Sequence, residues 1–369
     1  MELQTAKDAI DWLVQNKRWK NEHGWKNEKV HLTYFGGEPT LLWDEIIVPL
    51  TRYAFETYPE EVSFGITTNG TLLNEERIKF MAAYHIVPLL SIDGAPYTQN
   101  YNRPCHNSDQ YSFNLIKDNI PILLKYFPET TFRSTIDEHT VNKTFENYIF
   151  AQYMGFKNIY MMPNGRTEWD PKNLQILERE FKRIYMYMIS WFQKNEIPPI
   201  NCSCINDSFK RIRELVQKDI PMRSCVRCGL GTGMGSIGYD GKIYGCQEQN
   251  SQEEKSHFYL GDIYTGIDPK KHSQFLEEYM NVTAMTCGEH PEYCDSCPLK
   301  EICGTLNCPS SSYDLFQSFD KDNYVHCYWF RIMHECAVVT LKYLQENQTF
   351  KHFLTKQCDY HFHTEEEVS

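Results

Sequence analysis

The 369-residue chain has little or none of several features that mark common classes of protein. Positive charge is scarce, since 37 Lys and Arg face 49 Asp and Glu for a formal charge of −12, which argues against a nucleic-acid-coating surface. No apolar run approaches the roughly 18–20 residues that a membrane span needs. Met1 is not followed by a basic and then apolar signal segment. We therefore expect a cytoplasmic protein that contacts neither nucleic acid nor membrane.

Cysteine is nearly absent from the first half of the chain and abundant in the second. Of 14 cysteines, one is Cys105 and the rest lie between Cys202 and Cys358. In a long chain without an export signal, metal or iron–sulfur ligation accounts for many cysteines better than disulfides do. The uneven distribution predicts two modules, 1–200 and 201–340, followed by a C-terminal helix and acidic tail over 341–369.

The first module reads as strands alternating with helices. Asn74 is expected to cap a helix over 75–84, and Pro121 to break one over 114–125. Repeated strand–helix units are typical of a parallel sheet, so the sequence predicts an α/β fold. The expected strands are 31–35, 63–68, 87–92, 131–136 and 158–162.

Small and polar residues stand at the ends of four of these strands. A turn explains each of them taken alone. In α/β barrels, however, chemistry takes place at the carboxyl ends of the strands, so four such ends in succession favour a ligand site. The four segments are Gly36-Gly37-Glu38-Pro39, Thr68-Asn69-Gly70, Ser91-Ile92-Asp93-Gly94 and Arg133-Ser134-Thr135.

Eight of the later cysteines have the spacing of metal ligands, and Tyr239-Asp240-Gly241-Lys242 reads as a hairpin turn leading back to one of them, Cys246. Eight thiolates suffice for two [4Fe–4S] clusters, but zinc uses the same ligands, so spacing alone leaves two zinc sites open. The array runs Cys225-x2-Cys228, Cys246, then Cys294-x2-Cys297-x5-Cys303-x4-Cys308, and Cys327.

The other cysteines carry weaker predictions. Cys202 and Cys204 could be ligands but lack a second pair, and Cys287 is a possible substitute ligand. Ordinary small side chains are expected for the remaining three, and Cys336 is expected on the core face of a helix.

Together, the strand-end motifs and the cysteine array resemble a radical S-adenosylmethionine (SAM) enzyme with a SPASM domain. That family includes anaerobic sulfatase-maturating enzymes and maturases that build thioether bonds in ribosomally made peptides. The resemblance extends from about Val30 to about Cys336. It implies a partial (β/α)6-type parallel barrel missing its first strand, followed by a Cys-rich α+β SPASM domain.

The resemblance also implies a role for each strand-end motif. Gly36, Gly37, Glu38 and Pro39 would meet the amino group of SAM through backbone carbonyls and the Glu38 carboxylate. Ser91 and Asp93 would reach the ribose hydroxyls, and Asn69 would lie near the same rim. Arg133 would pair with the methionyl carboxylate, which suits a guanidinium fork.

For the cysteines, the resemblance implies two auxiliary [4Fe–4S] clusters. The first would take Cys225, Cys228, Cys246 and Cys308. The second would take Cys294, Cys297, Cys303 and Cys327. Because each would have four protein thiolates, neither would bind substrate, and both would carry an electron away from the product radical.

The chain departs from the family pattern in three places. It has no Cys-x3-Cys-x2-Cys, whose thiolates hold the SAM-cleaving cluster; we expect that third cluster only if a preceding segment supplies the motif, and we expect this polypeptide alone not to perform the radical step. Gln247 stands where sulfatase-maturating relatives have an Asp proton acceptor, and strand alternation would turn Glu248 the other way. Cys303-x4-Cys308 has one residue more than is usual.

The function implied is radical modification of a peptide or protein substrate, in which a 5′-deoxyadenosyl radical abstracts a hydrogen atom. Thioether formation is the leading reaction, and oxidation of Cys or Ser to formylglycine is the alternative. A cluster-less relative, acting as a non-catalytic iron–sulfur or zinc binding module, remains a second class. An electron donor such as flavodoxin or ferredoxin is the expected partner. The sequence assigns no residue to catalysis itself.

Overall fold

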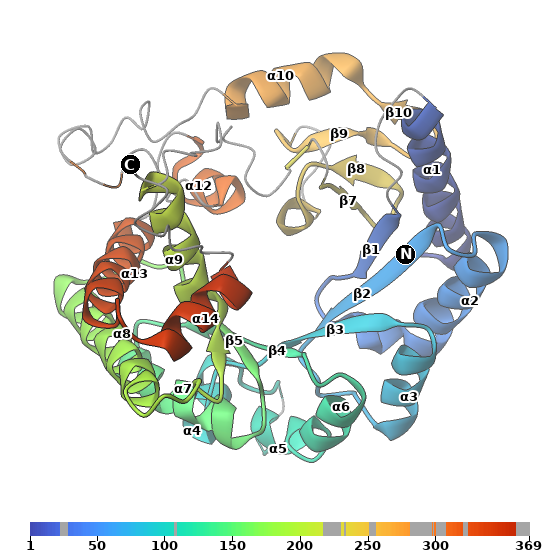
Figure 1. The fold of residues 1–369 in the computed structure, drawn as a ribbon. Helices are drawn as coiled ribbons and strands as arrows, with labels where there is room; N and C mark the ends of the chain where they lie inside the picture. Colours follow the sequence, from blue (N-terminus) through green and yellow to red (C-terminus); the bar gives the residue numbers. More distant parts are fainter. Residues whose placement is uncertain are drawn as a thin grey trace. The chain divides into compact units, whose positions relative to one another are not determined.

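The computed structural model describes residues 1–22, 29–106, 109–216, 230–231, 234–250, 256–280, 297, 299, 308–319 and 324–358. They form an α/β fold with a six-stranded sheet in the order β1-β2-β3-β4-β5-β6 (Figure 1). The chain divides into two compact units. Unit 1 comprises Met1–Ser91, Leu115–Thr130 and Ser224–Asn281, and unit 2 comprises Ile92–Asn114, Thr131–Arg223 and Val282–Ser369.

Unit 1 contributes the parallel strands β1 (Val30–Tyr34), β2 (Val62–Thr68) and β3 (Ile86–Ser91). One face of these strands is buried, as Phe64 and Ile66 are each 1% exposed, while Val87 on the opposite face is 61% exposed. In Figure 1 the helices of this unit line the outer side of the strands. They are α1 (Leu3–Glu22), the 3-10 helix η1 (Pro39–Leu42), the π-helix η2 (Trp43–Ile47), α2 (Val48–Thr57), α3 (Glu75–Ala83) and α6 (Ile120–Tyr126).

Of the two expectations about helices in unit 1, the cap at Asn74 is confirmed and the break at Pro121 is wrong. Asn74 caps α3, since its Oδ1 accepts the backbone N–H of Arg77 at 2.9 Å. Pro121 does not break a helix; it lies in the first turn of α6, where a missing N–H costs nothing. The interruption comes earlier, between α5 (Ser112–Ile116) and α6.

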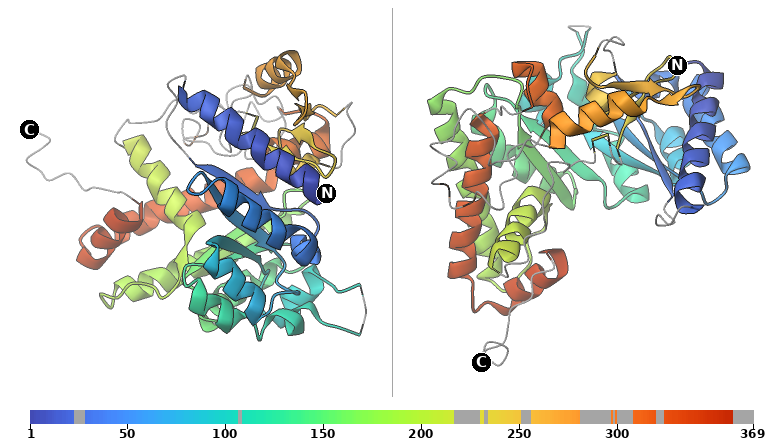
Figure 2. Two further views of the ribbon diagram at one scale, coloured as in Figure 1. Left: turned by 90° about the vertical axis from the view of Figure 1, so that its right-hand side faces the viewer. Right: turned by 90° about the horizontal axis from the view of Figure 1, so that it is seen from above.

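A second, antiparallel sheet also belongs to unit 1, in the order β10-β9-β8-β7. The expected hairpin is confirmed: Gly238 N donates to Lys242 O at 2.8 Å, and Gly241 has a φ of +85°. α10 (Pro269–Met280), orange, lies beside these yellow strands in both views of Figure 2. The strands are β7 (Ser236–Ile237), β8 (Lys242–Tyr244), β9 (Tyr259–Asp262) and β10 (Gly266–Ile267).

Unit 2 contributes the parallel strands β4 (Thr131–Ile136), β5 (Asn158–Pro163) and β6 (Asn201–Cys202). Its helices are α4 (Pro96–Asn102), the 3-10 helix η3 (Val141–Lys143), α7 (Thr144–Tyr153), α8 (Pro171–Phe192), α9 (Ser203–Val216), α12 (Pro309–Phe316), α13 (Tyr324–Tyr343) and α14 (Gln348–Cys358).

The core of unit 2 is built where α13 packs on α8. The hydroxyl of the buried Tyr185 donates to Met333 O at 2.8 Å, and the rings of Phe181 and Trp329 lie 6.3 Å apart. Cys336 is 8% exposed on the same face of α13, which confirms its expected core position. None of the helices described is long and apolar enough to cross a membrane.

Candidate functional site

In unit 1, the Glu38 carboxylate ties the carboxyl end of β1 to that of β2. Its Oε1 accepts hydrogen bonds from Thr40 N at 3.1 Å, from the Thr40 hydroxyl and from the Thr68 hydroxyl at 2.8 Å. Its Oε2 accepts the backbone N–H of Asn69 at 2.8 Å. A carboxylate oxygen has two lone pairs, so Oε2 keeps one for a further donor. Glu38 therefore builds the turn and still offers one acceptor site.

Beside Glu38, the Gly36-Gly37 turn leaves open space at the end of β1. Both glycines are exposed, and a Cβ added to either would meet no atom within 4 Å. Gly36 has a φ of +149°, which side-chain-bearing residues rarely adopt. A ligand can thus approach this stretch of backbone closely.

Two further predicted residues lie at strand ends of unit 1. Asn69 uses its Oδ1 locally, accepting from Thr71 N at 2.9 Å and from the Thr71 hydroxyl at 2.7 Å. Ser91 ends β3 half-buried, and its hydroxyl makes no hydrogen bond to any residue within the described ranges. Ser91 therefore keeps its full hydrogen-bonding capacity for a ligand.

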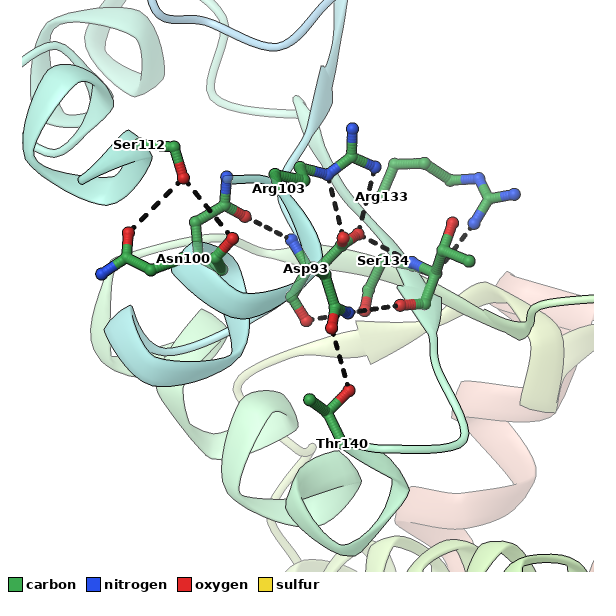
Figure 3. Close-up of polar contacts among 10 residues, drawn as sticks. Asp93, Asn100, Arg103, Ser112, Arg133, Ser134 and Thr140 are labelled. Atoms are coloured by element: carbon green, nitrogen blue, oxygen red, sulfur yellow. Dashed lines mark hydrogen bonds and ion pairs between the residues drawn. The ribbon is translucent and has the colours of Figure 1, made fainter. Parts of the chain in front are cut away.

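In unit 2, Asp93 lies at the centre of a hydrogen-bond network, drawn in Figure 3. Its side chain is 3% exposed and forms a two-point ion pair with Arg103, at 2.9 Å from Oδ2 to Nε and 3.1 Å from Oδ1 to Nη2. Its Oδ1 also accepts Thr135 N at 3.0 Å. Three of the four lone pairs of this carboxylate are thus used within the protein.

Arg133 projects from β4 with its guanidinium only partly exposed. Its Nη1 donates to Ser134 O at 2.8 Å, and its Cζ lies 4.8 Å from the centre of the Tyr160 ring on β5. No carboxylate of the described residues forms an ion pair with it, and burial lowers the pKa of this guanidinium. A cation that is partly buried without a counter-ion is ready to bind an anion.

Four of the eight cysteines predicted as cluster ligands are described. Cys246 is buried after β8, Cys297 and Cys327 are half-buried, and Cys308 caps α12, its Sγ accepting Ser311 N at 3.4 Å. The other four, Cys225, Cys228, Cys294 and Cys303, lie outside the described residues, as does Cys287. Within the described part of the chain, no three His, Cys, Asp or Glu side chains gather as metal ligands. The ligand sets therefore stay predictions.

The segment after Cys246 differs from the expected strand. Residues Gln247–Gln249 form the 3-10 helix η4, so strand alternation does not decide where Glu248 points. Gln247 is half-buried and Glu248 is exposed. Cys202 and Cys204, which the sequence left unpaired with other ligands, are buried with their sulfur atoms 3.3 Å apart.

Sequence reasoning missed several residues of these networks. Arg103 lies ten positions beyond Asp93 at the C-cap of α4, and no motif marks it as an ion-pair partner. Tyr160 faces Arg133 only because β4 and β5 pair in that register. Only Thr40 among these residues could have been found from local sequence. It lies two residues after Glu38, a spacing at which a side chain commonly hydrogen-bonds to nearby groups of the chain.

Comparison with known proteins shows a similarity in the first part of the chain. Residues 15–173 match the model of the Radical SAM superfamily. This part of the chain is therefore similar to a radical SAM domain. The domain match includes every strand-end motif of the six-stranded sheet named above.

Similar proteins include a sulfatase-maturating enzyme. The Cysteine-type anaerobic sulfatase-maturating enzyme of Clostridium novyi is 23% identical over 328 residues, covering 86% of this chain and 82% of that enzyme. The structure of anSMEcpe with bound AdoMet has a TM-score of 0.71 at 19% identity, over 98% of this chain and 90% of that one. Streptococcus suis SuiB bound to the precursor peptide SuiA has a TM-score of 0.52 at 17% identity, over 86% and 69%. The two structures share the fold of this chain.

Proposed function

We propose that this protein is a radical SAM maturase that modifies a peptide or protein substrate, and that its reaction forms a thioether between a peptide Cys and a neighbouring residue. The observation that carries this proposal is the open Gly36-Gly37 turn with Glu38 at the carboxyl end of β1, inside the radical SAM domain. The peptide held by SuiB and the Cp18Cys peptide held by anSMEcpe support a peptide substrate.

The residues present fit SAM as a ligand. An ammonium group needs acceptors, which the carbonyls of the Gly36-Gly37 turn and the remaining Oε2 lone pair of Glu38 supply. The uncommitted hydroxyl of Ser91 suits a ribose hydroxyl, with Asn69 and Pro39 completing the rim. Arg133, without a carboxylate partner in the described ranges, suits the methionyl carboxylate.

The cysteines described also suit iron–sulfur ligation. Cys308 Sγ already accepts a backbone N–H at the start of α12, and such donors stabilise thiolate charge. We assign Cys246 and Cys308 to one auxiliary [4Fe–4S] cluster with Cys225 and Cys228. Cys297 and Cys327 would join Cys294 and Cys303 in the other.

When bound with its cluster, SAM supplies a radical that abstracts a hydrogen atom from a peptide carbon. Thioether formation would then release the thiol proton of the peptide Cys, join sulfur to that carbon and pass one electron to an auxiliary cluster. Two hydrogen atoms leave the peptide and its sulfur stays. The protein's part is to orient the peptide and keep water from the radical.

A second reaction is favoured by the name of the Clostridium novyi relative, namely oxidation of Cys to formylglycine. That reaction needs a proton acceptor, and the amide of Gln247 cannot serve as one at ordinary pH. A non-catalytic binding module is the third alternative.

The test begins with anaerobic reconstitution of the chain with iron and sulfide. About eight iron per chain are expected, falling in Cys246→Ala and Cys297→Ala but not in the core variant Cys336→Ala. Zinc without sulfide would overturn the cluster assignment.

The reconstituted protein is then incubated with SAM, a ferredoxin or flavodoxin and Cys-containing peptides. The masses of the products are measured by mass spectrometry. Loss of two hydrogen atoms with sulfur retained supports the thioether reaction. Release of sulfide indicates formylglycine formation. Peptide binding without turnover indicates the binding module.

A further inference from the structure

We propose that Asp93 and Arg103 are positioning residues that set Arg133 for the carboxylate of the ligand, and that Asp93 is not itself a ribose ligand. This inference rests on the proposed binding of SAM. It changes the role that resemblance alone gave to Asp93, and it assigns a role to Arg103, which no sequence motif marked.

Asp93 has hardly any bonding capacity left for a ligand. Besides the three bonds to its carboxylate, its backbone N–H donates to Gln99 Oε1 at 2.8 Å, and its carbonyl accepts the Ser134 hydroxyl at 2.9 Å. Its side chain is 3% exposed. A ribose hydroxyl would have to displace a charge-assisted bond from Arg103 or the backbone bond from Thr135.

Arg103 has the geometry to hold Asp93 in place. It is the C-cap residue of α4, and its backbone N–H donates to Gln99 O at 2.9 Å. Its guanidinium donates to both carboxylate oxygens of Asp93 and so closes the loop from 93 to 103 (Figure 3). Lysine has no such fork and could hold only one oxygen at this geometry.

The bonds of Asp93 end on the residues around Arg133. Asp93 accepts from Ser134 and Thr135, and the preceding residue, Ile92, donates to the carbonyl of Arg133 itself at 3.0 Å. Side chains alternate along a strand, so fixing the buried Ser134 fixes the opposite projection of Arg133. If the Asp93–Arg103 pair is broken, the hydrogen bonds from Asp93 no longer hold this stretch of β4 in position. The Arg133 guanidinium is then no longer held in one orientation.

The test uses S-adenosylhomocysteine as the probe, with affinity measured calorimetrically on the full chain and no turnover required. Asp93→Asn and Arg133→Met are each expected to weaken binding about tenfold, the usual effect of one lost charge-assisted bond. The double variant is expected to lose about tenfold as well, because Asp93 acts through Arg133. Arg103→Lys should fall between wild type and Asp93→Asn.

Matched controls separate positioning from general stability. Arg18 grips both oxygens of Glu61 in unit 1 with a similar two-point pair, so Arg18→Ala should leave affinity unchanged. Guanidinium ion, added far below denaturing concentration, should restore affinity to Arg103→Ala, which a variant that had merely unfolded would not show. Circular dichroism verifies the fold of each variant.

The affinities of the single and double variants distinguish positioning of Arg133 from direct binding of the ligand by Asp93. Additive losses, about a hundredfold in the double variant, would show that Asp93 binds the ligand independently of Arg133 and would overturn the inference. Unchanged affinity in Asp93→Asn would overturn it as well. If the wild-type chain itself does not bind S-adenosylhomocysteine, the result overturns the proposed SAM site, on which this inference rests.

Discussion

Replacing Glu38 by Gln is expected to destabilise unit 1, because the Glu38 carboxylate joins the carboxyl end of β1 to that of β2. The carboxylate accepts four hydrogen bonds, two from backbone N–H groups of Thr40 and Asn69 and two from hydroxyls of Thr40 and Thr68. An amide has one oxygen and one NH2 group. Whichever way the substituted side chain turns, its NH2 group faces at least one backbone donor.

The smallest cost follows from the better of the two orientations. With the amide nitrogen toward Asn69, one bond to a charged acceptor is lost, worth about 1.5 kcal/mol, and the Asn69 N–H is left without its acceptor. Together these give a loss of about 2 kcal/mol in the free energy of unfolding. In the other orientation the amide nitrogen faces the backbone N–H of Thr40 and two hydroxyls, and the cost is higher because both hydroxyls must also turn to accept.

Two assays measure this loss in the free energy of unfolding. Urea unfolding should show a lower midpoint, and hydrogen exchange followed by mass spectrometry should show about thirtyfold faster exchange at the amides of Thr40 and Asn69. Glu76→Gln, at an exposed position on α3, makes the same chemical change as a control. Unchanged exchange at both amides, with an unchanged midpoint, would refute the reasoning.

Other changes have equally definite outcomes. Asn74→Ala removes the side-chain acceptor for Arg77 N and should cost about 1 kcal/mol, read as a lower thermal midpoint, whereas Asn74→Asp should keep most of the stability. Gly94→Ala places a Cβ 2.1 Å from Asn147 Oδ1, so it should cost about 1–3 kcal/mol in urea unfolding; a neutral effect would mean that the loop has room to move. Burial raises the pKa of the Cys336 thiol from its ordinary value of 9.0 to about 11, so its contribution to stability is present below pH 9 and declines as pH rises toward 11. Cys336→Ala should flatten that decline in alkaline denaturation, and an equal decline in both proteins would contradict the assignment.

Local pattern was enough to locate five strands of the six-stranded sheet, because alternation and turn residues act over short distances. It missed β6, whose two residues, Asn201 and Cys202, are too few to show alternation. The four strand-end motifs were recognised for the same reason, since a turn after a strand is written in consecutive residues. Pro121 shows the limit of that reasoning. A proline breaks a helix or begins one depending on where the helix starts, and the start was fixed by a turn at 117–119 that had no clear signal.

The sequence by itself determined the fold class, the N-cap at Asn74, the 239–242 hairpin and the set of residues worth examining, because each is encoded by neighbours along the chain. Only the tertiary structure decided what those residues do for one another. It showed that Glu38 already accepts the backbone N–H of Asn69 just after β2, that Asp93 is held by Arg103 ten positions away, and that Arg133 stacks on Tyr160 across a strand pair. Such partnerships depend on register and on the return of a loop, which follow from packing of the whole unit rather than from the residues at either end of the contact.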